Sequence, residues 1–154
     1  MALTIEVIEI CLEGCIEAAY KREEGIYRPY VGAVVLARDG SPVGIGTKEY
    51  ISDSRVLYMH AERMALFQAG ERARGGTLIT TLEPCTRVPR GFQILKPCAE
   101  LIPEFGIKTV VIGLKDTGSR VNGRGIKYLQ DRGIEIQMYD GPQATRLKKL
   151  VTLR

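Results

Sequence analysis

Histidine is almost absent from this chain of 154 residues, because His60 is the only one. Any imidazole chemistry must therefore involve this residue. Long apolar runs are absent too: stretches such as Thr109 to Gly113 are far shorter than the roughly 20 residues that a membrane-spanning helix needs. We therefore expect no transmembrane span and no membrane partner.

The N-terminus lacks the basic start and the uninterrupted apolar stretch of a signal peptide. Acidic residues recur there instead, at Glu6, Glu9, Glu13 and Glu17. Without an export signal, the four cysteines are expected to be reduced thiols, and the protein is predicted to be cytoplasmic. Cys11 and Cys15 lie four residues apart on an apolar helical stripe, where the preferred interpretation is a small buried hydrophobic side chain.

Charge is distributed unevenly along the chain, although the net charge is only +4. Residues 1–83 contain nine basic and twelve acidic side chains, whereas residues 84–154 contain thirteen basic and six acidic ones. This asymmetry fits an anionic partner such as a phosphorylated metabolite or a nucleic acid. It fits a solvated basic face without a ligand equally well.

The hydrophobic pattern predicts a single α/β domain over residues 1–154. Helices are expected at residues 4–21, 60–70, 98–105, 125–132 and 142–154. Strands are expected at residues 31–37, 43–48, 77–82, 108–114 and 133–139, the first two forming a hairpin. We interpret residues 49–59 as a polar connection and residues 84–97 as a loop. This order predicts a three-layer α/β/α fold with a five-stranded mixed sheet and a right-handed parallel crossover over residues 108–139.

Two glycine pairs do not match any phosphate-binding or dinucleotide-binding pattern. Gly44 and Gly46 form one pair, and Gly123 and Gly125 form the other. Since the remaining glycines of such patterns are missing, we interpret both pairs as turns.

The chain's chemistry is predicted to centre on one histidine and two cysteines that each follow a proline. His60 is followed two residues later by Glu62, and Cys85 and Cys98 follow Pro84 and Pro97. One imidazole and two thiolates are three ligands suited to Zn²⁺, and they leave a fourth tetrahedral position for water. Glu62 would then handle the proton of that water. We therefore predict a catalytic zinc site with the ligands His60, Cys85 and Cys98 and the catalytic residue Glu62.

Residues in and around this site have further expected roles. His60 and Cys98 are expected to open helices, and the partial positive charge at a helix N-terminus would favour a thiolate at Cys98. In a regular helix His60 and Glu62 would point about 200° apart, so the geometry of the first turn must bring them together. Glu83 is expected to be a structural hydrogen-bonding acid, and Thr80 and Thr81 are interpreted as strand residues.

These motifs resemble the zinc signature of the cytidine deaminase-like superfamily, over residues from about Pro29 to about Ile136. The resembling segments are His60-Ala61-Glu62, Thr81-Leu82-Glu83-Pro84-Cys85 and Pro97-Cys98-Ala99-Glu100-Leu101-Ile102. Residues 31–35, the Gly44-x-Gly46 strand and residues 116–125 most resemble the deaminase domain of bacterial riboflavin biosynthesis. The resemblance implies hydrolytic replacement of an exocyclic amine by oxygen, with Glu62 carrying a proton to a ring nitrogen and then to ammonia.

The loop between the two metal-type cysteines departs from the nucleobase deaminase pattern. Twelve residues separate Cys85 from Cys98, whereas that pattern has two. Arg87, Arg90 and Lys96 lie in this loop without an acidic residue among them, so they are candidates for binding a substrate phosphate. A solvent-exposed loop is the alternative.

The resemblance also implies substrate contacts outside this loop. Arg28 stands where relatives carry an amide that meets substrate, Lys48 falls near a position that contacts ribose, and Asp116 opens a substrate-side run. The implied substrate is a small-molecule nucleobase, nucleoside or nucleotide, and a phosphoribosylaminopyrimidine of the riboflavin route is the leading candidate. The resemblance further implies a homo-oligomer, and we expect no reductase domain after Arg154.

Two other functions remain open from the sequence. The first is deamination of a base in nucleic acid such as tRNA, which the basic residues Arg146, Lys148, Lys149 and Arg154 of the final predicted helix would support. The second is a noncatalytic, zinc-stabilised binding module, which a fourth protein ligand on the metal would support.

Overall fold

A five-stranded mixed sheet forms the centre of the protein in the computed structural model, which describes residues 3–20, 31–47, 49–50, 58–86, 96–115 and 123–152. The sheet strands are β1 (Gly32–Leu36), β2 (Pro42–Thr47), β5 (Thr77–Leu82), β6 (Thr109–Leu114) and β7 (Glu135–Met138). The helices are α1 (Ile5–Tyr20), α2 (Ala61–Ala69), α3 (Cys98–Glu104), α4 (Arg124–Asp131) and α5 (Ala144–Thr152).

Strand order in the sheet is β2-β1-β5-β6-β7. β1 runs antiparallel to both β2 and β5, whereas β5, β6 and β7 are parallel to one another. The carboxyl ends of parallel strands meet at one edge of a sheet, which is where such folds place their ligands. In this chain, Glu83 to Cys85 lie at that edge directly after β5, and Lys115 lies there directly after β6.

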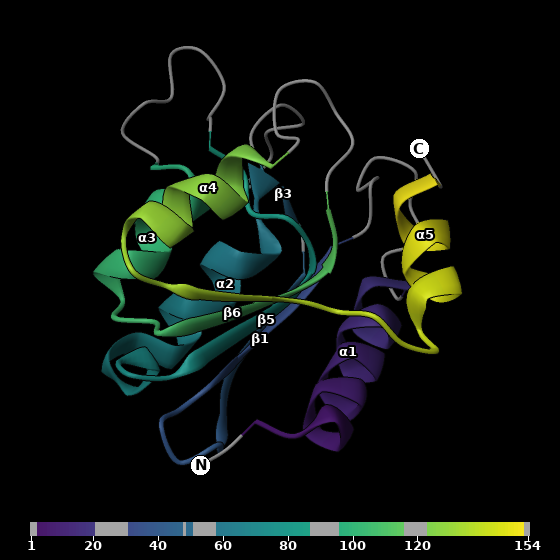
Figure 1. Cartoon of the computed structure of the whole chain (residues 1–154), viewed down its shortest axis with the longest axis horizontal. Coiled ribbons are helices and arrows are strands. Elements are labelled where there is room, and N and C mark those ends of the chain that lie inside the picture. The colour runs from purple at the N-terminus through teal and green to yellow at the C-terminus, as the bar shows by residue number, and fades with distance from the viewer. Residues whose placement is uncertain are drawn as a thin grey trace.

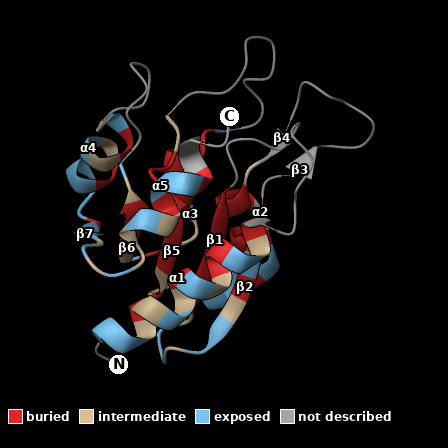
Figure 2. Cartoon of the chain, turned by 90° about the vertical axis from the view of Figure 1, so that its right-hand side faces the viewer, coloured by how far each residue is buried: buried red, intermediate tan, exposed pale blue. Residues whose placement is uncertain are grey.

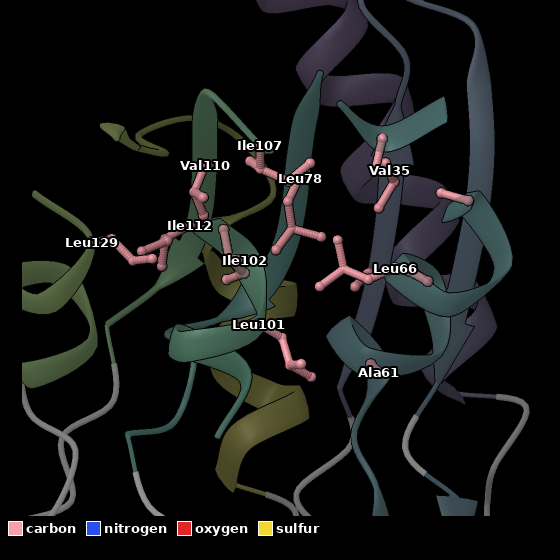
Figure 3. Packing of buried hydrophobic residues seen from close by; sticks show 14 of the residues in the cluster. Val35, Ala61, Leu66, Leu78, Leu101, Ile102, Ile107, Val110, Ile112 and Leu129 are labelled. Atoms are coloured by element: carbon pink, nitrogen blue, oxygen red, sulfur yellow. The ribbon is translucent and has the colours of Figure 1, made fainter. Parts of the chain in front are cut away.

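Helices cover both faces of the sheet (Figure 1). α2, α3 and α4 pack on one face, where Figure 3 shows Leu66, Leu78 and Ile102 among the side chains of the larger apolar cluster. α1 and α5 lie side by side against the other face (Figure 2), and their apolar side chains fill two smaller clusters. The predicted three-layer fold with a five-stranded mixed sheet is therefore confirmed.

Glycines allow two helices to approach the sheet closely, one on each face. A Cβ atom on Gly46 would lie 2.2 Å from the carbonyl oxygen of Ala61 in α2, and one on Gly44 would lie 2.1 Å from that of Ala65. On the other face, a Cβ atom on Gly32 would lie 2.3 Å from the carbonyl oxygen of Cys15 in α1. The interpretation of Gly44 and Gly46 as a turn is therefore wrong, because both lie in β2 beneath α2.

The second glycine pair does lie at a turn. Gly123 precedes α4 with a φ angle of 78°, in the left-handed region that favours glycine. Gly125 belongs to the helix itself, and a Cβ atom there would lie 2.2 Å from the carbonyl oxygen of Pro84. Gly125 therefore allows α4 to lie close to the segment that follows β5.

The predicted polar connection over residues 49–59 is wrong at its two ends. Glu49–Tyr50 forms β3 and Tyr58–Met59 forms β4, and these strands pair antiparallel with each other in a separate small sheet. A pairing of two residues with two is too short to produce a hydrophobic period in the sequence. A 3₁₀ turn at Gly70–Ala73 also continues directly from α2, whereas the sequence predicts that the helix ends at Gly70.

Within the residues that the structure describes, no helix is both long and apolar enough to cross a membrane. The cytoplasmic location, the assignment of residues 1–154 to one domain and the assembly into a homo-oligomer stay predictions.

Candidate metal centre

His60, Cys85 and Cys98 reach the site from three different elements. His60 directly precedes α2 at its N-cap position, with an extended backbone (φ −69°, ψ 153°). Cys85 follows β5 after Glu83 and Pro84, and Cys98 is the first residue of α3. Because His60 lies outside the regular helix, the 200° separation from Glu62 does not apply, and the first turn brings the two side chains to one site as the sequence requires.

The three side chains present their ligand atoms to one another. Nδ1 of His60 lies 3.4 Å from Sγ of Cys85 and 3.5 Å from Sγ of Cys98, and all three ligand atoms lie within 4.8 Å of one another. Nitrogen and sulfur ligands bound tetrahedrally to one zinc ion would be about 3.6 Å apart, given the usual bond lengths. Both the types of donor and their spacing therefore fit zinc, and among the described residues the group has three members.

Cys85 and Cys98 are electrostatically unlike in the metal-free pair. The pKa of Cys85 lies well below its usual value. The largest cause is a hydrogen bond from the Cys98 thiol, and smaller causes are the nearby His60 and the backbone N–H of Cys98. The pKa of Cys98 lies well above its usual value, mainly because of the same hydrogen bond and, to a smaller extent, because the residue is buried. Without a metal ion, these opposite shifts favour the thiolate on Cys85 over the thiolate on Cys98. The expected thiolate at Cys98 in the zinc-bound protein stays a prediction.

Glu62 is a buried carboxyl group beside this trio. Its side chain is 4% exposed, and its Oε1 accepts a hydrogen bond of 3.0 Å from the hydroxyl group of Thr80. Burial is the largest cause that raises the pKa of Glu62, while His60 and hydrogen bonds from Cys98 and Thr80 act in the opposite direction. A carboxyl group with a raised pKa can hold and release a proton, which is what a general acid–base catalyst needs.

Glu83 has a structural position, which confirms the expectation for this acid. Its carboxylate accepts hydrogen bonds from the backbone N–H groups of Gly123 (3.1 Å) and Ile126 (3.2 Å) at the start of α4. Carboxylates are favourable at helix N-termini because the first N–H groups have no partner within the helix. Glu83 therefore fastens α4 to the chain segment that carries Cys85.

Two buried polar residues of the site were not identified from the sequence. Arg63 is 3% exposed, and its guanidinium group donates a hydrogen bond to the backbone carbonyl of Lys96, two residues before Cys98. The sequence predicts Thr80 only as a strand residue, whereas its hydroxyl group contacts Glu62. A hydroxyl group on a buried strand was the available signal for Thr80, whereas no pattern distinguishes Arg63 from a surface arginine.

The predicted substrate contacts are Arg28, Lys48, Arg87, Arg90 and Asp116, and all five lie outside the described residues. Lys96, the third basic residue of the cysteine loop, is exposed and forms an ion pair with Glu104 of α3. This hydrogen-bonded pair raises the pKa of Lys96. The loop itself therefore has no acidic residue, but Glu104 of α3 supplies an acidic partner for Lys96.

Comparison with known proteins agrees with this geometry. The family described as the cytidine and deoxycytidylate deaminase zinc-binding region matches residues 6–114. The riboflavin biosynthesis protein RibD of Aquifex aeolicus is 43% identical over 110 residues, which are 71% of this chain and 28% of that protein. A diaminohydroxyphosphoribosylamino-pyrimidine deaminase of Buchnera aphidicola is 36% identical over 71% of this chain and 68% of its own length.

A solved structure is similar over nearly the whole chain. The diaminohydroxyphosphoribosylaminopyrimidine deaminase/5-amino-6-(5-phosphoribosylamino)uracil reductase of Thermotoga maritima is 39% identical, with a TM-score of 0.76. The similarity covers 94% of this chain and 39% of the Thermotoga chain. This chain thus spans roughly a quarter to two fifths of the length of the larger relatives that it matches.

Proposed function

Because the chain belongs to the cytidine and deoxycytidylate deaminase zinc-binding family, we propose that it is a zinc-dependent hydrolytic deaminase of an aminopyrimidine. His60, Cys85 and Cys98 are the proposed zinc ligands, and Glu62 is the proposed catalytic residue. The observation that carries this proposal is the position of a buried carboxyl group beside an imidazole and two sulfur atoms that are spaced as ligands of one ion.

Glu62 is the proton carrier in this proposal. Zinc, when bound, supplies a water molecule whose pKa is lowered toward about 7. Glu62 accepts a proton as the water oxygen bonds to the ring carbon, and it passes that proton to the ring nitrogen. It then delivers the second proton of the water to the departing amine. The carbon–nitrogen bond breaks, ammonia leaves and the oxygen remains on the ring.

The proposed substrate is a phosphoribosylaminopyrimidine of the riboflavin route. The names of the Buchnera and Thermotoga relatives support this choice. We propose that Arg87 and Arg90 bind its phosphate, and that Arg28, Lys48 and Asp116 contact the rest of the substrate. The excess of basic residues after position 83 is consistent with an anionic substrate.

A nucleic-acid substrate receives no support from the described part of the chain. The basic residues Arg146, Lys148 and Lys149 lie on α5, which packs with α1 on the face of the sheet opposite α2 (Figure 2). A strand of RNA that followed this helix would therefore be on the far side of the sheet from Glu62. The noncatalytic module is also disfavoured, because the metal group has three members within the described ranges and retains a carboxyl neighbour.

The direct test is an ammonia-release assay on the zinc-loaded protein. The panel contains free bases, nucleosides, nucleotides, a phosphoribosylaminopyrimidine and tRNA, with Glu62→Gln as the control for contaminating deaminases. We expect release of ammonia from the phosphoribosylaminopyrimidine and loss of that release in Glu62→Gln. Release from tRNA alone would reject the substrate, and a Glu62→Gln variant with unchanged turnover would reject the mechanism.

A further inference from the structure

Thr80 is a polar residue at a position where packing alone requires none. It lies in the middle of β5 with 0% of its surface exposed, between Leu78 and Leu82 of the larger apolar cluster. Valine has nearly the same shape and an equal preference for strands, so it would satisfy both the sheet and the core. A buried hydroxyl group is costly unless it has hydrogen-bond partners.

The Thr80 hydroxyl group has two such partners, and one of them belongs to the metal centre. Its Oγ1 lies 3.0 Å from Oε1 of Glu62 and 3.1 Å from the carbonyl oxygen of Leu82. The hydroxyl group has one proton, so it donates to either Glu62 or the Leu82 carbonyl of its own strand; when Glu62 is protonated, it can donate to Oγ1 while Oγ1 donates to the Leu82 carbonyl. Thr80 thereby links the carboxyl group of Glu62 directly to β5.

Thr81, the next residue, shows that the contact is specific to one face of the sheet. Its side chain is also buried (2% exposed), and its hydroxyl oxygen accepts a hydrogen bond of 3.1 Å from the backbone N–H of Gly32. Successive strand residues point to opposite faces, so Thr81 faces α1 rather than Glu62. The two threonines are therefore a matched pair with equal burial and the same chemistry.

We propose that Thr80 is a positioning residue for Glu62, and that it fixes the carboxyl group on which the proposed deaminase reaction depends. Glu62 has a flexible side chain that must meet water, ring nitrogen and leaving amine in turn, so a displacement of about 1 Å can cost on the order of 100-fold in rate. A hydroxyl group can donate to a carboxylate and accept from a carboxylic acid, so this contact is compatible with both forms of a proton carrier.

The test compares Thr80→Val, Thr80→Ser and Thr81→Val in the zinc-loaded full chain. Thr80→Val should lower kcat by about 10- to 100-fold, with KM within about twofold and zinc content unchanged, because the hydroxyl group touches Glu62 and not the substrate. Thr80→Ser should restore most of kcat. Thr81→Val removes an equally buried hydroxyl group and should leave kcat within about twofold of wild type.

A purely structural role would give other results. Equal losses of kcat in Thr80→Val and Thr81→Val, or failure of Thr80→Ser to recover activity, would overturn the proposal. If Thr80→Val does not fold, Thr80→Ser and Thr80→Ala serve as the pair that differs only by the hydroxyl group.

Thermal unfolding of zinc-loaded protein provides a readout that is independent of activity. The melting temperatures of wild type, Thr80→Val, Glu62→Ala and the double variant form a double-mutant cycle. Non-additive shifts support the contact, and additive shifts overturn it. A wild type that releases no ammonia would reject the proposed function, whereas this cycle would still decide whether Thr80 holds Glu62.

Discussion

The two faces of the sheet each have a fully buried cysteine, and the two residues have different surroundings. Cys15 of α1 lies on one face, where its thiol has a weak contact of 4.0 Å with the carbonyl oxygen of Ile79. Burial is the main cause that raises the pKa of Cys15 far above its usual value. Cys98 on the other face has Cys85, His60 and Glu62 as polar neighbours. Burial by itself makes a thiol inert, whereas a neighbouring thiol and an imidazole give Cys98 the surroundings that a zinc ligand requires.

Removal of a sulfur from each face should give the largest contrast. Cys98→Ala or Cys85→Ala should lose zinc and ammonia release together, with a drop in melting temperature, since metal binding contributes to folding. Cys15→Ala should lose roughly 1 kcal/mol of stability and keep zinc. Metal analysis of the purified variants checks this. Normal zinc content in both site variants would refute the ligand assignment.

The two buried glutamates are predicted to have different roles, Glu62 in catalysis and Glu83 in structure. Glu62→Gln should lower kcat by about 10²- to 10⁴-fold at unchanged zinc content, because proton transfer is lost. Glu83→Gln should cost about 1–3 kcal/mol of unfolding free energy, because a charged acceptor for two N–H groups is lost. Steady-state kinetics and urea unfolding of both variants separate the roles. A Glu83→Gln variant that loses kcat as Glu62→Gln does would remove the distinction.

Alkylation measures the difference between the thiols directly. In metal-free protein at pH 7, Cys85 should react with iodoacetamide at least about tenfold faster than Cys15, since the thiolate is the reactive form. The advantage of Cys85 should persist as pH falls until the pH passes below its lowered pKa. Peptide mass spectrometry identifies the modified residue, and added zinc should protect Cys85. Faster labelling of Cys15 would contradict the comparison.

The smallest expected effect comes from the glycines beneath the two helices. Gly46→Ala and Gly32→Ala should each cost about 1–3 kcal/mol, because the new Cβ atom meets a helix carbonyl oxygen closer than contact distance. Only Gly46→Ala should also lower kcat, by a few-fold, because α2 carries Glu62. Unfolding curves and kinetics check both variants. Equal kcat losses would show that the two faces are coupled.

Much of the site could be predicted because its chemistry is concentrated in short motifs. A single histidine followed by Glu62, and two Pro-Cys pairs, left few other sets of zinc donors in the chain. The strands and helices that carry them followed from hydrophobic periods, which the core enforces over several residues.

Contacts between distant segments could not be predicted in this way. Thr80 meets Glu62 across 18 positions of the chain, and Arg63 meets the backbone of Lys96 across 33. The place of Gly46 beneath α2 likewise depends on which helix packs over β2. A local pattern shows that a residue is small, polar or buried, but its partner is determined only when the chain packs.

The dual role of Glu83 has a consequence for protein engineering. Its backbone N–H donates to the carbonyl of Leu114 at the end of β6, and its carboxylate holds the N–H of Gly123. The residues on both sides of the segment 115–122 are thus hydrogen-bonded to Glu83. A replacement segment of different length would therefore begin and end at the same positions. Each doubling of the loop length costs only about 0.6 kcal/mol of loop-closure entropy. Segments of different length can therefore be placed between Leu114 and Gly123 with little loss of stability.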